Sequence, residues 1–261
     1  MSVVALVARQ RSGTGALGSI LNQHPEVRYC GEIFHNNHSK AHNFFNFVAA
    51  EVKKENFDFL LPGNADYKFE KYIEHLHSCF QDRVKVVDIK YNSFHHLNEC
   101  WHGLTEAPNL IKLLKKHNIP IIHLTRRNTL KTYVSSQLAH KNSAWHTSVQ
   151  SKAKVKTVEL DPVLTLRWLN HTQLEISRMN SLLSNYPQVL EIEYQELFDE
   201  EGYLDSKVGS TIASILDVQD FKRTKPLIIK QAKSHLSSSI LNLDEIKNKL
   251  TGTDFNWMLD D

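Results

Sequence analysis

Apolar runs of strand length alternate with amphipathic segments of helix length along most of the chain, and this alternation limits the fold more than any other feature. The predicted strands are residues 3–8, 27–30, 84–90, 120–124 and 189–192, and the predicted helices are residues 16–23, 39–54, 67–80, 107–117, 128–139 and 162–183. Residues 140–160 are polar and basic with weak periodicity, which predicts a loop. Strands that alternate with helices favour a mainly parallel sheet covered on both faces, which is an α/β fold.

The number of domains follows from length and composition. The chain has 261 residues, near the upper end of what one hydrophobic core supports. Its hydrophobic content of 41% and charged content of 23% are those of an ordinary globular protein. The sequence contains no internal repeat and no linker rich in Pro, Gly or Ser. We therefore expect a single domain over residues 1–261.

Charge and cysteine usage restrict the classes of partner and the compartment. The formal net charge of +2 is too small to argue for binding to nucleic acid or to a membrane surface. Cys30, Cys79 and Cys100 lack a CxxC spacing and suit a reducing compartment. Residues 1–13 contain too short an apolar run for a signal peptide or a membrane span. These features predict a cytoplasmic protein without an integral membrane span.

The first candidate site lies where the first strand passes into the first helix. Several backbone N–H groups of such a turn face one point, and the helix N-terminus adds partial positive charge, so the turn is suited to bind phosphate. Arginine side chains add fixed charge, and serine and threonine add hydroxyl donors. The predicted nucleotide-binding residues of this segment are Arg9, Arg11, Ser12, Gly13, Thr14, Gly15 and Ala16.

Three other interpretations of this turn compete with a phosphate site of this kind. A Walker A loop requires a lysine that the turn lacks. The residues from Gly13 to Gly18 match the dinucleotide pattern GxGxxG, with Glu32 as the acid that would bind a ribose. Against this interpretation, Arg9 and Arg11 crowd a turn that normally approaches pyrophosphate with bare backbone. In the third interpretation, the turn is a glycine-rich connection that binds no ligand.

A second candidate site follows the predicted strand 120–124. Asn128 is suited to cap a helix, which places Arg127 just before the helix and Ser135 about 10 Å along its axis. An arginine side chain can reach down such a helix, so both residues can contact one phosphate. Taken alone, the pattern also fits an ordinary basic helix start. Together with the first site, it predicts a ligand that carries phosphates at opposite ends.

These two motifs resemble those of sulfotransferases that use 3′-phosphoadenosine 5′-phosphosulfate (PAPS). Residues 9–14, RQRSGT, look like the loop that binds the 5′-phosphosulfate, and Arg127 followed by Ser135 looks like the motif that binds the 3′-phosphate. The pair Gly31-Glu32 and the later Ala139 make the likeness closest to bacterial carbohydrate sulfotransferases of the trehalose and nodulation-factor type. The chain departs from that family at Gly15, where a second hydroxyl residue is common.

The resemblance implies a three-layer, P-loop-like α/β fold and the transfer of a sulfuryl group from PAPS to an acceptor hydroxyl, on a carbohydrate or glycolipid. It implies that Glu32 is the catalytic base. Lys90, at the end of the predicted strand 84–90, is expected to place an ammonium group over the transferring group. Each of the two also has a plainer interpretation, as a solvated charge at a strand end. No metal is required, since the chain itself supplies the positive charge.

Several other residues invite a functional interpretation. His35 and His38, and the adjacent His95 and His96, lack a third ligand at a spacing typical of zinc, so we expect no metal site. Trp145 and His146 are expected either to contact the acceptor or to anchor the loop. A basic run near the C-terminus either contacts the nucleotide through one or two members or is a solvated face; it comprises Lys222, Arg223, Lys225 and Lys230.

Two functions from other classes compete with sulfuryl transfer. The first is an NAD(P)-dependent oxidoreductase that uses the GxGxxG match, and it has no use for Arg127 and Ser135. The second is a binding module that keeps a nucleotide site without activity, and it has no use for Glu32. Binding of 3′-phosphoadenosine 5′-phosphate, compared with NAD and ATP, distinguishes the three.

Overall fold

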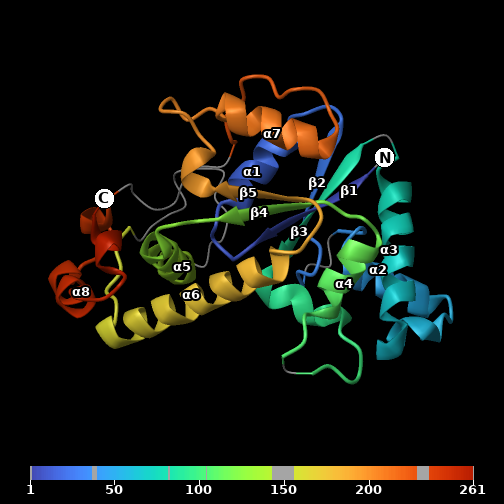
Figure 1. The fold of residues 1–261 in the computed structure, drawn as a ribbon, viewed down its shortest axis with the longest axis horizontal. Helices are drawn as coiled ribbons and strands as arrows, with labels where there is room; N and C mark the ends of the chain where they lie inside the picture. The colour runs from blue at the N-terminus through green and yellow to red at the C-terminus, as the bar shows by residue number, and fades with distance from the viewer. Residues whose placement is uncertain are drawn as a thin grey trace.

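The computed structural model describes residues 2–36, 40–81, 83–103, 105–142, 156–227 and 235–260, and it contains a five-stranded, all-parallel sheet (Figure 1). The strand order is β2-β3-β1-β4-β5. The strands are β1 (Val3–Ala8), β2 (Val27–Glu32), β3 (Val84–Lys90), β4 (Ile121–Thr125) and β5 (Val189–Glu193). The helices are α1 (Thr14–Leu21), α2 (Phe44–Lys53), α3 (Ala65–Cys79), α4 (Asn109–Lys116), α5 (Thr129–Asn142), α6 (Pro162–Leu183), α7 (Ser206–Leu216) and α8 (Leu243–Leu250).

The central strand β1 is buried on both faces, which is why its sequence is apolar throughout. Val3, Ala5 and Val7 pack into one cluster of buried side chains, and their neighbours Val4 and Leu6 pack into another on the opposite face. Alternate residues of a strand point to opposite faces, so a strand covered on both sides needs apolar residues at every position.

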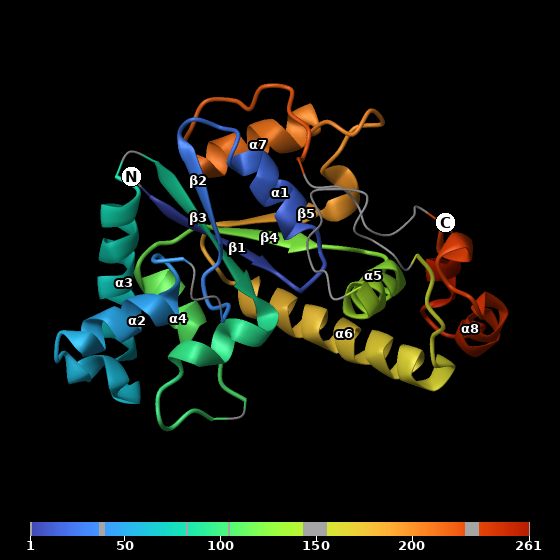
Figure 2. The same cartoon turned by 180° about the vertical axis from the view of Figure 1, so that it is seen from behind.

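Helices cover both faces of the sheet, which gives the three-layer α/β arrangement. Side chains of α2, α3, α4 and the C-terminal end of α6 pack on one face, and those of α1 and α7 pack on the other. The two opposite views in Figures 1 and 2 show α1 and α7 together on one side of the strands. The expectation of an α/β fold with a parallel sheet flanked by helices is therefore confirmed.

A third cluster of buried side chains lies beside the sheet, where β4 ends. It joins Leu130, Val134 and Leu138 of α5 to Leu169 of α6 and Ile246 of α8. Asn128 caps α5 as predicted, because its side-chain oxygen accepts a hydrogen bond from the amide of Lys131 at 3.0 Å. The cluster fixes α5 against the end of the sheet and so fixes the position of Ser135.

The elements differ from the prediction in a few places. The strand predicted to end at residue 30 runs on to Glu32, through a register shift between Tyr29 and Gly31. Helix α5 continues to Asn142, into the segment predicted to be a loop, whereas residues 143–155 of that segment lie outside the described residues. Helices α7 and α8 were not predicted. Helix α2 begins later than expected, where Asn43 caps it.

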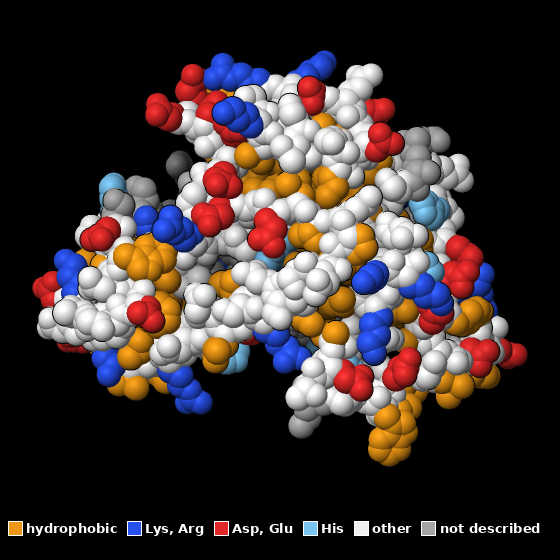
Figure 3. Space-filling model, in the orientation of Figure 1, with side chains coloured by type: hydrophobic (Ala, Val, Ile, Leu, Met, Phe, Trp, Pro, Cys, Tyr) orange, Lys and Arg blue, Asp and Glu red, His pale blue; other side chains and the backbone are white. Residues whose placement is uncertain are grey.

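The surface carries charges of both signs. On the face shown in Figure 3, Lys and Arg side chains are interspersed with Asp and Glu side chains, in keeping with the small net charge of +2. Among the described residues, no helix combines the length and the apolar character needed to cross a membrane.

We predict that Gly18→Ala destabilises the protein by about 1–3 kcal/mol. A Cβ atom at Gly18 would lie 2.2 Å from Cε1 of Tyr29, and that ring cannot move easily because its hydroxyl donates to Asp88 at 2.6 Å. Gly63→Ala is the matched control, since nothing lies within 4 Å of a Cβ atom there. Denaturant unfolding of both variants measures the difference. Equal stability of the two variants would contradict the prediction.

Candidate functional site

Segments that carry the candidate residues meet at the carboxyl edge of the sheet. The loop of residues 9–13 follows β1, Glu32 ends β2, Lys90 ends β3, and Arg126 and Arg127 follow β4. All strands are parallel, so their carboxyl ends share one edge. The central β1 lies between β3 and β4, so the connections on its two sides run in opposite directions. Open parallel sheets bind their ligands at such a point.

The turn between β1 and α1 leaves backbone N–H groups available at the helix start. The amides of Ala16 and Leu17 donate to the carbonyl oxygen of Gly13, at 3.0 and 3.1 Å. The amides of Gly13, Thr14 and Gly15 donate to no other residue in the described part of the chain. Free amides at a helix N-terminus, with the partial positive charge of the helix, form a site for an anion.

The shape of this turn depends on two residues in the left-handed region. Arg11 has φ 66° and Gly13 has φ 100°. Gly13 must also lack a side chain, because a Cβ atom there would lie 2.2 Å from Cδ2 of Tyr194, the residue that follows β5. The Tyr194 ring therefore packs directly on the turn. Ser12, between the two left-handed residues, is buried.

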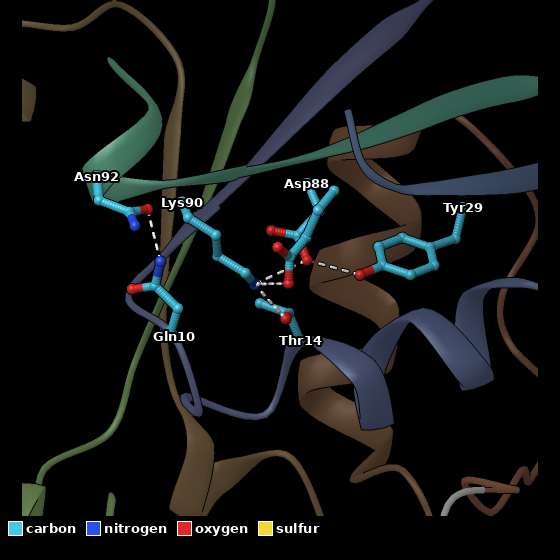
Figure 4. A network of polar contacts seen from close by, with 7 residues as sticks. Gln10, Thr14, Tyr29, Asp88, Lys90 and Asn92 are labelled. Carbon is cyan, nitrogen blue, oxygen red and sulfur yellow. Dashed lines mark hydrogen bonds and ion pairs between the residues drawn. The ribbon is translucent and has the colours of Figure 1, made fainter. Parts of the chain in front are cut away.

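Lys90 places its ammonium group inside the site (Figure 4). Its Nζ donates to Thr14 Oγ1 at 2.5 Å and to Asp88 Oδ2 at 2.8 Å, and it lies 3.7 Å from Glu32 Oε1. Parallel register explains the convergence, because Lys90 lies opposite Ala8, the last residue of β1, and Asp88 lies opposite Glu32. The Lys90 side chain is only 3% exposed. The structure thus brings Lys90 and Glu32 together with the start of α1.

Asp88 is a member of the site that the sequence analysis missed. Its Oδ2 atom accepts from both Lys90 and the Tyr29 hydroxyl, and its Oδ1 atom is buried with no hydrogen-bond partner among the described residues. Burial first, and then the charge of Asp88, raise the pKa of Tyr29 well above its usual value, so Tyr29 remains a hydrogen-bond donor. In the sequence, Asp88 could have been recognised as the one carboxylate in a strand that is otherwise apolar or basic.

Glu32 is the one carboxylate of this network that solvent reaches. Its side chain is 33% exposed, against 0% for Asp88. A ligand group entering from solvent can therefore meet the Glu32 carboxylate beside the Lys90 ammonium. Nearby, Gln10 Nε2 donates to Asn92 Oδ1 at 2.5 Å and ties the loop after β1 to the segment after β3. The arrangement can bind an anion and accept a proton from a neighbouring hydroxyl.

The two predicted anion sites are joined by Arg11. Its Nη2 and Nε atoms donate to Ser135 Oγ at 2.8 and 3.2 Å. Arg126, which the sequence analysis did not single out, donates to the carbonyl oxygen of Arg11 at 3.4 Å and lies over the Tyr194 ring at 5.1 Å. Arg11, Arg126 and Ser135 thus form one continuous group, which we call the arginine cluster.

Two other predicted arginines contact residues outside this cluster. Arg127 is exposed, and its guanidinium lies 5.3 Å from the centre of the Trp257 ring. Arg9 donates to Glu175 Oε2 at 2.7 Å and stacks over Trp168 at 4.3 Å, so it ties the loop after β1 to helix α6. Arg9 therefore connects the loop to α6, whereas Arg127 is accessible to solvent at the edge of the site.

The histidines do not gather into a ligand set in the described part of the chain, where no group of three or more His, Cys, Asp or Glu could hold a metal ion. His96 packs against the rings of Phe34 and Phe45, at 5.4 and 5.0 Å, and burial lowers its pKa. Three of the residues considered above, His38, Trp145 and His146, lie outside the described residues.

The C-terminal basic run contacts residues of its own neighbourhood. Arg223 pairs with Glu201 at 2.6 Å and stacks over the Tyr203 ring at 4.0 Å, and Lys225 lies 4.2 Å from the same ring. Lys230 lies outside the described residues. These contacts fit a surface role for Arg223 and Lys225.

Neither a scan against protein-family models nor a search of curated proteins finds a match to this chain.

We predict that Lys90→Met destabilises the protein by about 3–5 kcal/mol, because it leaves the buried Asp88 carboxylate without its ammonium partner. Adding Asp88→Asn should recover much of that loss, since the uncompensated charge is then gone. Urea unfolding of the two single variants and the double variant gives the coupling energy. Strictly additive effects would show that the two groups do not depend on each other.

Proposed function

We propose that this protein transfers a sulfuryl group from PAPS to an acceptor hydroxyl, on a carbohydrate or glycolipid. The observation that carries the proposal is the arrangement around Lys90, whose ammonium group lies between the start of α1 and Glu32. Sulfuryl transfer needs an anion site, positive charge beside the leaving oxygen and a base for the acceptor proton. Residues suited to these three roles lie side by side at one edge of the sheet, which supports the proposal.

The nucleotide would be held at both of its phosphate ends. The free amides of Gly13, Thr14 and Gly15, with the Ser12 and Thr14 hydroxyls, suit the 5′-phosphosulfate. Ser135 suits the 3′-phosphate, as the resemblance implies. Arg127 lies at the rim and would reach that phosphate by leaving the Trp257 ring.

The chemical step uses Glu32 and Lys90. The acceptor oxygen bonds to sulfur while the bond between sulfur and the bridging oxygen of the 5′-phosphate breaks, and the electron pair of that bond stays on the phosphate oxygen. The acceptor proton passes to the Glu32 carboxylate. The Lys90 ammonium, already bonded to Thr14, stabilises the charge that grows on the leaving oxygen. Asp88 holds the Lys90 side chain in place through its contact at 2.8 Å.

The arginines argue against a dinucleotide site at the same turn. Gly18 of the GxGxxG match is closely packed against Tyr29, so the helix needs a glycine there whatever the ligand. Arg11 and Arg126 add positive charge above what bare backbone provides for a pyrophosphate. An oxidoreductase would leave the arginine cluster without a role.

We predict that 3′-phosphoadenosine 5′-phosphate binds at least about tenfold more tightly than AMP, since one additional charge-assisted phosphate contact accounts for such a factor. Arg127→Ala should remove most of the difference. Isothermal titration calorimetry, with NAD and ATP as comparison ligands, measures the affinities. Equal affinity for AMP would refute a site for two phosphates, and preferential binding of NAD would favour the dinucleotide interpretation.

We predict that Glu32→Gln lowers turnover by about 10²-fold or more while leaving nucleotide affinity nearly unchanged. The substitution keeps the size of the side chain and removes only the proton acceptor. A panel of sugars and glycolipids first identifies a working acceptor, and the variant is then assayed for sulfated product and for nucleotide binding. A variant that binds the nucleotide poorly but turns over normally would assign Glu32 to the ribose instead.

A further inference from the structure

Arg126 holds a guanidinium group in the site without a carboxylate beside it. Within the described residues, no Asp or Glu forms an ion pair with Arg126, and its two contacts are the Tyr194 ring and the carbonyl oxygen of Arg11. The second contact, at 3.4 Å, is a long hydrogen bond. A guanidinium carries five N–H donors, so most of the donor capacity of Arg126 remains for another partner.

A second arginine lies next to it. Burial lowers the pKa of Arg11, and the positive charge of the neighbouring Arg126 lowers it further. Burial also lowers the pKa of Arg126. Like charges away from water are unfavourable unless an anion lies between them. The free protein therefore keeps two arginines together at a cost that a bound anion would remove.

The Ser135 hydroxyl completes the group. It accepts two hydrogen bonds from Arg11, so its own hydrogen stays available for donation to a ligand oxygen. Ser135 is fixed on α5 by the buried cluster of that helix and is itself buried. Arg11 thus links the two other residues, because its guanidinium donates to Ser135 and its carbonyl oxygen accepts from Arg126.

We propose that Arg126 is a ligand of the phosphate monoester that binds at Ser135, which is the 3′-phosphate of the nucleotide; this inference rests on the proposed function. A phosphate monoester carries close to two negative charges and three acceptor oxygens, which matches two arginines and a hydroxyl. The sequence motif pairs Ser135 with Arg127 and not with Arg126. In the structure, however, Arg126 is the less exposed of the two arginines.

Tyr194 prepares Arg126 for this role. The centre of its ring lies 5.1 Å from the guanidinium carbon of Arg126 and the ring also packs against Gly13, so the same aromatic residue contacts the first anion site and Arg126. A stacked guanidinium has already lost part of its rotational freedom, and less is therefore lost when the phosphate binds.

Arg126→Ala tests the inference with three probes, namely 3′-phosphoadenosine 5′-phosphate, adenosine 3′-phosphate and adenosine 5′-phosphate. Isothermal titration calorimetry should show a loss of affinity of about tenfold or more for the two ligands with a 3′-phosphate. Affinity for adenosine 5′-phosphate should be unchanged. Arg223→Ala is the matched control, because Arg223 also stacks on a tyrosine but pairs with Glu201. It should leave the affinities for all three probes unchanged.

Arg126→Lys is a second variant in case Arg126→Ala fails to fold, because lysine keeps the charge and loses only the planar guanidinium. Its affinity for the two ligands with a 3′-phosphate should lie between that of the wild type and that of Arg126→Ala. An equal loss for all three probes would overturn the inference, because Arg126 would then serve the 5′ end. Unchanged binding of the 3′-phosphate ligands by either variant would overturn it as well. If the wild-type protein itself shows no preference for a 3′-phosphate, the proposed function fails and this inference fails with it.

Discussion

The buried ion pair between Lys90 and Asp88 is the interaction on which the site depends. An ammonium group that is almost fully removed from water keeps its charge only beside a carboxylate. Asp88 provides that carboxylate, and the Tyr29 hydroxyl holds the same oxygen from the other side. Held by Asp88, the Lys90 ammonium group faces both the first residue of α1 and Glu32. Weakening the pair would disturb the strand, the helix start and the solvent-facing acid together.

The pairing of the strands fixes the relative positions of the site residues. Parallel register sets Lys90 beside the last residue of β1, and it sets Asp88 beside Glu32. Order along the sheet then brings the segment after β4 to the other side of the same loop. Residues separated by more than a hundred positions, such as Arg11 and Ser135, come within hydrogen-bond distance for this reason. The geometry of the candidate site therefore depends on the pairing of the strands as well as on the contacts between its side chains.

The sequence predicts the strands and long helices well, because burial on both faces and long apolar stripes leave clear patterns. It also predicts which strand ends carry charge, and so it identifies Lys90 and Glu32. It does not reveal Asp88, Arg126 or Tyr194, whose roles follow from their neighbours in the folded sheet. Spacing alone likewise favours Arg127 as the partner of Ser135, whereas in the structure Arg11 donates to Ser135 and Arg127 lies over the Trp257 ring.

The register shift in β2 also affects how the molecule meets others of its kind. β2 lies at one margin of the sheet, where unpaired N–H and C=O groups can recruit a strand from another chain. The shift between Tyr29 and Gly31, where Gly31 adopts φ 74°, interrupts that row of groups just before Glu32. An irregular margin is a poor template for further pairing. Side chains occupy part of the same margin, since the Tyr29 amide donates to Asn22 and the Cys30 carbonyl oxygen contacts the His42 ring, so β2 offers little to a strand from another chain.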